Sequence, residues 1–256
     1  MVITFNKLGE YGRLGNQMFQ YATLKSVGAK KGFEVKIPKG NYALKNLNLQ
    51  SDIITDEESK KIDKSYSERF FHFDKNVFDI ADNTNLFGYF QSYKYFDNIK
   101  ESLSREFSVE SKEDEAVEFM MEAMPVRVGV HVRRTDYLKF PNIHPFPGLD
   151  YYKKSFEVYR DNFACTFVVC SDDIKWCKEN FVGDDFLFSE SNDSIFDLML
   201  LSNCDHNIIA NSSFSWWGAY LNCNLSKIIT SPNKWMGKNG PQDYYDLTPI
   251  SWRQQE

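Results

Sequence analysis

The stretch "RVGVHVRRTDYLKF", residues 127–140, begins as a strand and ends in a group of charged side chains. Its valines alternate with other residues and share one face of the strand, so His131 and Arg133 share the other face. We expect both to project where the strand ends. A guanidinium there is a permanently charged fork of donors suited to phosphate or carboxylate. The alternative is that Arg133 or the adjacent Arg134 pairs with Asp136.

Strands and helices alternate regularly on the C-terminal side of this stretch. We expect strands at 126–132, 166–171, 186–189, 207–211 and 227–232, and helices at 150–163, 173–181, 193–204 and 213–223. Such alternation predicts βαβ units in a parallel, doubly wound sheet. In these sheets ligands bind at the carboxyl ends of the strands. We place a domain boundary near Pro125.

Polar residues follow two further strands of the predicted sheet. Asp172 and Asp173 come after "VVCS"; one could cap the next helix while the other accepts hydrogen bonds from a nucleobase edge. Asn211, Ser212 and Ser213 precede a helix, where hydroxyls and free backbone N–H groups can form a phosphate cradle. Ordinary capping by serine is the alternative, but arginines at the same edge of the sheet favour the cradle.

The N-terminal half is less regular. A glycine-flanked loop, "YGRLGNQ", opens a helix predicted over residues 12–32. The loop matches neither the dinucleotide fingerprint GxGxxG nor the phosphate-binding GxxxxGK[ST]. Its Arg13 and Asn16 could meet the two arginines from across a cleft.

The composition is that of a folded protein with no affinity for nucleic acid. The chain has 256 residues, of which 42% are hydrophobic and 16% aromatic. Its formal net charge is -6, and no block rich in lysine and arginine provides the basic face of a nucleic-acid binder. No apolar run approaches the roughly 20 residues needed to span a bilayer.

The cysteines and the N-terminus indicate a reducing compartment. The five cysteines are an odd number and form no CxxC pair, and the first residues lack the layout of a secretory signal. We therefore expect free thiols and a cytoplasmic location. The four scattered histidines are not spaced to form a zinc site with these cysteines.

Taken together, these motifs resemble those of the α-1,2-fucosyltransferases, which are inverting enzymes that use GDP-fucose. The similar segments run from residue 12 almost to the end: "GRLGNQMFQYA", "GYFQSYKYF", "HVRRTDY", "DYYKKSF", "VVCSDD" and "ANSSFSWWGAYL". The resemblance implies an α/β, GT-B-like architecture of two Rossmann-like domains facing across a cleft, with the parallel sheet clearest in the C-terminal half. Residues 1–124 would form the acceptor side and residues 125–256 the GDP-fucose domain.

The resemblance also implies roles for individual residues. Arg133 would contact the diphosphate, and one of the two adjacent aspartates would read the guanine edge. Related protein O-fucosyltransferases carry a similar loop whose asparagine approaches the reacting centre, which suggests the same for Asn16. The predicted catalytic residues are Arg133, Asp136 and Asn16, and the predicted donor-binding residues are Arg13, Gln17, His131, Arg134, Asp172, Asp173, Asn211, Ser212, Ser213 and Phe214.

The predicted reaction moves L-fucose from GDP-fucose to the 2-hydroxyl of a terminal galactoside, with inversion. No D-x-D motif is present to hold a metal–diphosphate, so we expect no metal and no other cofactor. Asp136 is the nearest candidate for a general base, or else it holds an arginine, with Arg134 as the expected brace. Another GDP-sugar as donor, or a non-catalytic carbohydrate-binding protein rich in aromatic residues, is the alternative.

Overall fold

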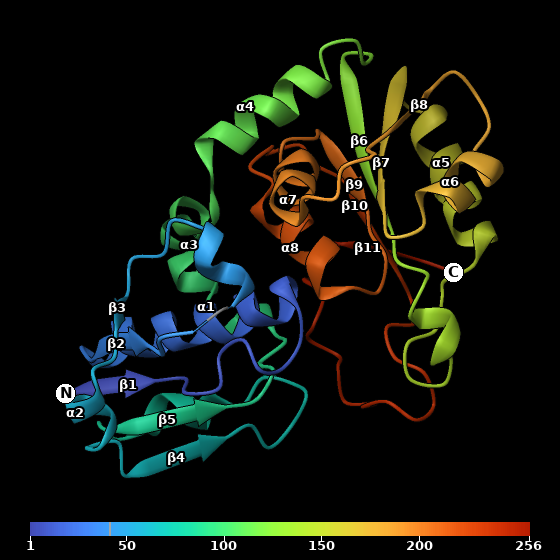
Figure 1. Cartoon of the computed structure of the whole chain (residues 1–256). Coiled ribbons are helices and arrows are strands. Elements are labelled where there is room, and N and C mark those ends of the chain that lie inside the picture. Colours follow the sequence, from blue (N-terminus) through green and yellow to red (C-terminus); the bar gives the residue numbers. More distant parts are fainter. Residues whose placement is uncertain (41) are drawn as a thin grey trace. The chain divides into compact units, whose positions relative to one another are not determined.

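The computed structural model describes residues 1–40 and 42–256, which form two compact units. Unit 1 comprises Met1–Ser108 and Asp243–Pro249, and unit 2 comprises Val109–Gln242 and Ile250–Glu256. Figure 1 shows the elements of both. The chain passes from one unit to the other before the boundary expected near Pro125, and a short late segment returns to unit 1.

Unit 2 follows the predicted alternation of strands and helices closely. Its elements are α4 (Glu110–Phe119), β6 (Val126–Val132), α5 (Leu149–Arg160), β7 (Cys165–Ser171), α6 (Ile174–Asn180), β8 (Phe186–Phe188), α7 (Ser194–Ser202), β9 (His206–Ile208), α8 (Ser213–Leu221), β10 (Ile229–Pro232) and β11 (Arg253–Gln255). Strand β11, which lies near the C-terminus, was not predicted. A 3₁₀ turn at Tyr137–Lys139 follows β6.

The sheet of unit 2 has the strand order β11-β10-β9-β6-β7-β8, and all its strand pairs are parallel. If the six strands are numbered 1 to 6 in chain order, with β6 as strand 1, the order read from β8 to β11 is 3-2-1-4-5-6. This is the strand order of a doubly wound fold. The direction of winding reverses between β6 and β9, which are direct neighbours. The carboxyl ends of these two strands therefore form the edge where a ligand is expected.

Helices cover both faces of this sheet, α5 and α6 on one and α7 and α8 on the other (Figure 1). The valines of β6 lie in a buried cluster with Tyr152 and Phe156 of α5. On the opposite face, a Cβ added to Gly129 would lie 3.2 Å from the Leu201 side chain of α7. The missing side chain thus allows α7 to approach the sheet closely.

Unit 1 also contains a parallel sheet. Its elements are β1 (Val2–Thr4), α1 (Leu14–Lys31), β2 (Glu34–Ile37), β3 (Asp52–Ile53), α2 (Asp56–Ser59), β4 (Lys64–Ser67), β5 (Thr84–Phe87) and α3 (Lys100–Phe107). Short 3₁₀ turns lie at Ala43–Asn46, Lys75–Asp79, Tyr93–Tyr95 and Asp97–Ile99. The strand order is β3-β2-β1-β5-β4, again with parallel pairs.

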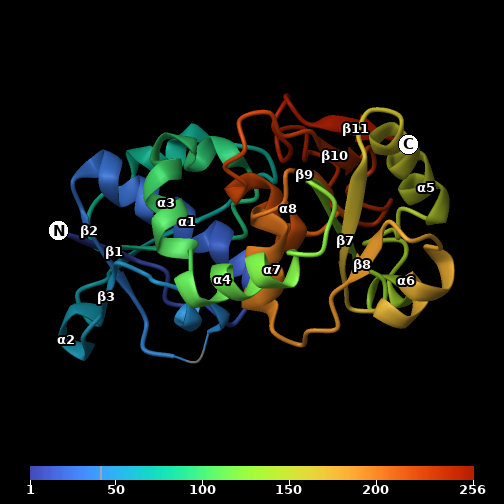
Figure 2. The same cartoon turned by 90° about the horizontal axis from the view of Figure 1, so that it is seen from above.

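Helix α1 is the central helix of unit 1. It ends at Gly32, which adopts a left-handed conformation (φ 68°) that glycine favours. The Gly32 N–H donates to the Gly28 carbonyl. Helix α3 packs against it (Figure 2), with the Phe107 ring 5.9 Å from the ring of Tyr21. Within the described residues, no helix combines the length and apolar character needed to cross a membrane. The five cysteines are free thiols.

Candidate functional site

The carboxyl ends of β6 and β9 are joined by direct contacts. The Tyr137 hydroxyl donates to the carbonyl oxygen of Asn211 over 2.8 Å. The rings of His131 and Phe214 lie 5.2 Å apart. The guanidinium carbon of Arg133 lies 5.9 Å from the centre of the Tyr137 ring. The structure therefore brings the end of the arginine strand to the start of α8, as the sequence predicted for this edge.

Arg133 is held between two carboxylates. Its Nη2 lies 2.7 Å from Asp136 Oδ2, and its Nη1 lies 3.1 Å from Asp172 Oδ2. The side chain is 15% exposed. These ion pairs fix the direction of the guanidinium before any ligand binds, and they balance part of its charge. Asp136 is thus an ion-pair partner of Arg133.

Asp172 fastens the loop after β6. Its Oδ1 accepts a hydrogen bond from the Arg134 N–H at 2.9 Å, and its Oδ2 accepts from the Thr135 N–H at 3.3 Å and from the Thr135 hydroxyl. Both carboxylate oxygens are already engaged within unit 2. A nucleobase would therefore have to donate to the second lone pair of a carboxylate oxygen that already accepts a hydrogen bond from the protein.

Arg134 and Asp173 form a separate pair. Arg134 Nη1 lies 2.5 Å from Asp173 Oδ2, and its guanidinium stacks over the Trp176 ring at 4.9 Å. Asp173 is also the N-cap of α6, because its Oδ1 accepts from the Trp176 N–H at 3.3 Å. Of the two predicted capping residues, Asp173 is the one that caps. Arg134 braces α6 against the β6 loop.

His131 is an uncharged ring buried at the end of β6. It is 5% exposed, and burial lowers its pKa to about 3, with the nearby Arg133 charge lowering it further and Asp172 opposing. Its Nδ1 is buried without a hydrogen-bond partner in the described structure. A neutral imidazole beside Phe214 offers a flat, apolar surface and one ring nitrogen to a planar ligand such as a nucleobase.

The turn into α8 is built by its own side chains. The Ser212 hydroxyl accepts from the Phe214 N–H at 3.3 Å, so Ser212 is the N-cap. Asn211 Nδ2 donates to the carbonyls of Pro145 (3.0 Å) and Trp235 (2.8 Å). Asn211 therefore holds neighbouring loops in place, and Ser213 is the half-buried hydroxyl at the first position of the helix. A helix N-terminus favours an anion.

The three remaining predicted residues, Arg13, Asn16 and Gln17, belong to unit 1. All lie where the loop after β1 enters α1, with Arg13 exposed at the N-cap position. Gln17 is structural: its Nε2 donates to the Gly12 carbonyl at 3.1 Å and its Oε1 accepts from the Ala43 N–H at 2.8 Å. Asn16 Oδ1 accepts from Gln91 Nε2 at 2.6 Å.

Two contributors to these sites were not predicted. Tyr137 joins the two strand ends of unit 2, and Gln91 holds Asn16 in unit 1. Both lie in segments that resemble the α-1,2-fucosyltransferases, "HVRRTDY" and "GYFQSYKYF". That resemblance is the signal by which the sequence could have indicated them. The roles themselves depend on contacts with residues about 75 positions away, which no local pattern shows.

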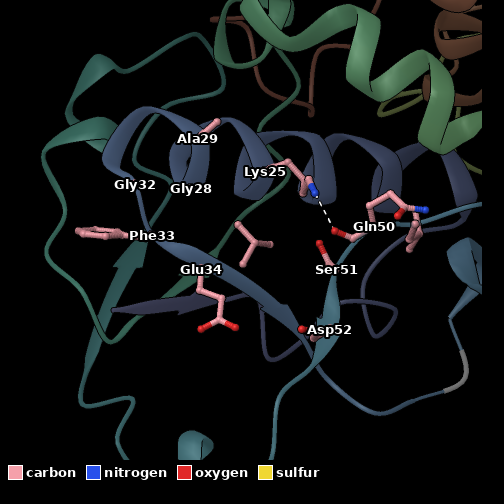
Figure 3. A pocket seen from close by; sticks show the side chains of 11 residues that line it. Lys25, Gly28, Ala29, Gly32, Phe33, Glu34, Gln50, Ser51 and Asp52 are labelled. Atoms are coloured by element: carbon pink, nitrogen blue, oxygen red, sulfur yellow. Dashed lines mark hydrogen bonds between the residues drawn. The ribbon is translucent and has the colours of Figure 1, made fainter.

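A hollow of about 630 Å³ lies elsewhere in unit 1. Figure 3 shows the Lys25 ammonium group donating to the Gln50 carbonyl, a hydrogen bond of 2.9 Å. Gly28 and Gly32 also line this hollow. None of the predicted site residues lines it. In the part of the chain that the structure describes, no group of three or more His, Cys, Asp or Glu side chains could hold a metal ion.

Comparison with known proteins assigns the chain to a class of transferases. The family model "Glycosyl transferase family 11" matches residues 3–243. The chain belongs to this family of glycosyltransferases.

Three curated relatives illustrate the range of the family. The O-antigen biosynthesis glycosyltransferase WbnK of Escherichia coli is 27% identical over 94% of this chain and 97% of its own. The alpha-1,2-colitosyltransferase of Escherichia coli is 29% identical over 94% and 95%. The galactoside alpha-(1,2)-fucosyltransferase 2 of Rattus norvegicus is 27% identical over 84% and 66%.

A solved structure supports the fold. POFUT1 in complex with GDP-fucose superposes with a TM-score of 0.55 and 12% sequence identity, covering 86% of this chain and 93% of that chain. The predicted α/β, GT-B-like fold class is confirmed, with a parallel sheet in each unit.

Proposed function

We propose that this glycosyltransferase moves L-fucose from GDP-fucose to the 2-hydroxyl of a terminal galactoside, with inversion and without a metal ion. The observation that carries the proposal lies at the switch point between β6 and β9: Arg133 lies beside the Tyr137 ring, and the Tyr137 hydroxyl donates to the Asn211 carbonyl just before α8. Two relatives named as α-1,2-transferases and a fold relative bound to GDP-fucose support the choice of donor and linkage.

The diphosphate would lie between Arg133 and the first turn of α8. Arginine matches two phosphate oxygens with two parallel N–H groups, and the helix dipole adds favourable potential. Because Asp136 and Asp172 already aim the guanidinium, little reorganisation is needed when the donor binds. The guanine would rest near the neutral His131 and the ring of Phe214.

The chemistry is a displacement at the anomeric carbon. The oxygen of the acceptor hydroxyl forms a bond to C1 of fucose while the bond from C1 to the β-phosphate oxygen breaks, and GDP leaves with the electron pair. Negative charge grows on that phosphate oxygen, so a fixed donor such as Arg133 stabilises the transition state more than the ground state. The hydroxyl proton leaves to a base or to water.

Asp136 is the candidate for that base within unit 2. Its Oδ2 accepts from Arg133 at 2.7 Å, so this oxygen is already engaged by a guanidinium. We assign Asp136 to holding Arg133. A loose transition state with much positive charge on the sugar makes a strong base unnecessary.

Unit 1 is proposed to carry the acceptor side, with Asn16 as the residue that approaches the reacting sugar. The colitosyltransferase relative shows that the family includes transfer of another sugar, so the second candidate for the donor is a different GDP-sugar. A non-catalytic lectin is disfavoured, because it has no need of an arginine held by two carboxylates at the switch point of a doubly wound sheet.

Thermal shift with free nucleotides tests the donor class. A ligand that binds only the native state raises stability by about 2.7 kcal/mol at 100 times its dissociation constant. We expect GDP to raise the melting temperature and UDP and NAD to leave it unchanged. Stabilisation by UDP or NAD in place of GDP would refute a GDP-sugar donor.

The metal-free mechanism has its own test. Transfer measured after treatment with EDTA should keep its rate, because Arg133 and the α8 N-terminus carry the phosphate charge. A rate that collapses with EDTA and returns with Mn²⁺ would contradict this account.

A further inference from the structure

Glu68 binds the backbone of the turn at residues 88–91, at the carboxyl end of the unit 1 sheet. It directly follows β4, and its carboxylate spans two consecutive N–H groups: Tyr89 donates to Oε2 at 2.7 Å and Phe90 donates to Oε1 at 2.8 Å. Phe90 has a φ of 53°, in the left-handed region where phenylalanine is uncommon. Such a conformation persists only where the surroundings impose it. The bidentate carboxylate is one of the groups that impose it.

The turn is packed tightly around Glu68. A Cβ added to Gly88, whose φ is 154°, would lie 2.4 Å from the Glu68 Cβ. The Phe90 ring is fully buried, 5.5 Å from the ring of Tyr95 and 6.3 Å from that of Phe5. The side chain after Phe90 therefore leaves the turn in one fixed direction.

That next side chain is Gln91, which reaches Asn16. Its Nε2 donates to Asn16 Oδ1 at 2.6 Å. One helical turn further along α1, Gln20 Nε2 donates to the Gly88 carbonyl at 3.1 Å, so α1 holds both ends of the turn. On its other side Asn16 abuts Gly12, where an added Cβ would lie 2.3 Å from Asn16 Nδ2. The Asn16 oxygen is thus engaged, and its NH₂ group, which bonds none of the residues that the structure describes, can donate to a ligand.

We propose that Glu68 is a positioning residue: its carboxylate holds the 88–91 turn so that Gln91 orients the Asn16 amide for sugar transfer. The inference rests on the proposed function, because it takes Asn16 to approach the reacting sugar. Neither Glu68 nor Gln91 touches the substrates in this account. A displacement of about 1 Å at a reacting group can cost about 10²-fold in rate.

The ionisation of Glu68 supplies a readout. Burial raises its pKa to about 7; the two N–H groups oppose the shift and the charge of Asp243 adds to it. The buried Tyr95 phenol also interacts with it. Protonation of the Glu68 carboxylate converts one of its two acceptor oxygens into a hydroxyl, which then faces a backbone N–H of the turn. We therefore expect kcat to fall as the pH drops through about 7.

The test compares Glu68→Gln with the wild type. The amide keeps one acceptor but directs an NH₂ group at the second N–H of the turn. We expect kcat to fall about 10- to 100-fold, the KM for GDP-fucose to stay within about twofold, and the acid limb near pH 7 to disappear. Glu68→Asp, which keeps a carboxylate, should recover part of kcat and keep an acid limb. Glu57→Gln, on the exposed helix α2, is the matched control and should behave as wild type.

Amide hydrogen exchange separates the possible failures. Glu68→Gln should speed exchange at Tyr89 and Phe90 at fixed pH without lowering the melting temperature by more than a few degrees. Unchanged kcat and acid limb in Glu68→Gln, or a loss confined to the KM for GDP-fucose, would overturn the positioning role. Unchanged exchange would show that Glu68 does not hold the turn, even if the wild type transferred no fucose and the proposed function itself failed.

Discussion

The two units present the same kind of sheet edge with opposite chemistry. At the edge of unit 2, two arginines and three aspartates form ion pairs around the ends of β6 and β7. At the edge of unit 1, side-chain amides on α1 and on the turn after β5 form the contacts, together with one carboxylate that binds backbone N–H groups. Both edges lie at the carboxyl ends of parallel strands.

Two units of the same architecture can thus serve different parts of one reaction. A fixed cation suits a diphosphate, whose charge grows as the bond to the sugar breaks. Amides suit a sugar, whose hydroxyls need donors and acceptors of moderate strength. The comparison predicts that changes in unit 2 affect the chemical step through charge, whereas changes in unit 1 affect it through position.

Removing the charge at unit 2 should have the largest effect. We expect Arg133→Ala to lower kcat by at least about 10²- to 10³-fold, because a fixed donor to the leaving phosphate is lost. Initial rates of transfer from GDP-fucose measure this. Circular dichroism and the melting temperature check that the fold persists although Asp136 and Asp172 lose their partner.

Arg133→Lys is the matched control for this prediction. Lysine keeps the charge but not the planar fork, so it should recover only part of the activity. Near-normal turnover by Arg133→Ala would mean that the diphosphate is held elsewhere.

Asp136 should have a smaller effect, because we assign it to aiming Arg133. We expect Asp136→Asn to lower kcat no more than about tenfold, since the amide oxygen can still accept from Arg133. Loss of a general base typically costs about 10²–10⁴. A loss in that higher range, with an altered pH–rate profile, would make Asp136 the base.

The pH dependence of stability should differ in sign between the two edges. The pKa of His131 is lowered from 6.5 to about 3, so its contribution to the free energy of unfolding is present above 6.5 and is lost as the pH falls towards 3. The pKa of Glu68 is raised from 4.5 to about 7, so its contribution is present below 4.5 and is lost as the pH rises through 7.

Urea unfolding between pH 4 and 8 measures both slopes. Glu68→Gln should remove the decline on the neutral side, and His131→Gln should flatten the decline on the acid side. Slopes that neither substitution changes would show that other groups set the pH dependence.

Much of unit 2 could be predicted from the sequence because short apolar strands alternate regularly with segments of helix length. The alternating valines and the run of apolar segments after residue 125 predicted a parallel sheet, and the strand ends predicted that the segment after β6 and the start of α8 lie at the same edge. The pairing of Arg133 with Asp172 could not be predicted, because it joins neighbouring strands that lie far apart in the sequence.

Unit 1 was harder to predict for physical reasons. Strand β3 has two residues and β4 reads "KSYS", so neither has an apolar periodicity. Their pairing depends on the sheet around them. Glu68 stands in a polar stretch like any exposed glutamate, and its role depends on the turn at Tyr89 and Phe90, 21 and 22 residues later.

Analysis of the reaction product determines donor, acceptor and linkage in one measurement. The protein is incubated with GDP-fucose and a panel of β-galactosides, and the linkage and anomeric configuration of any product are determined by NMR. We predict fucose joined α-1,2 to a terminal galactose, with GDP released in equal amount. Fucose on another hydroxyl or another sugar, or a product formed only from a different nucleotide sugar, would contradict it.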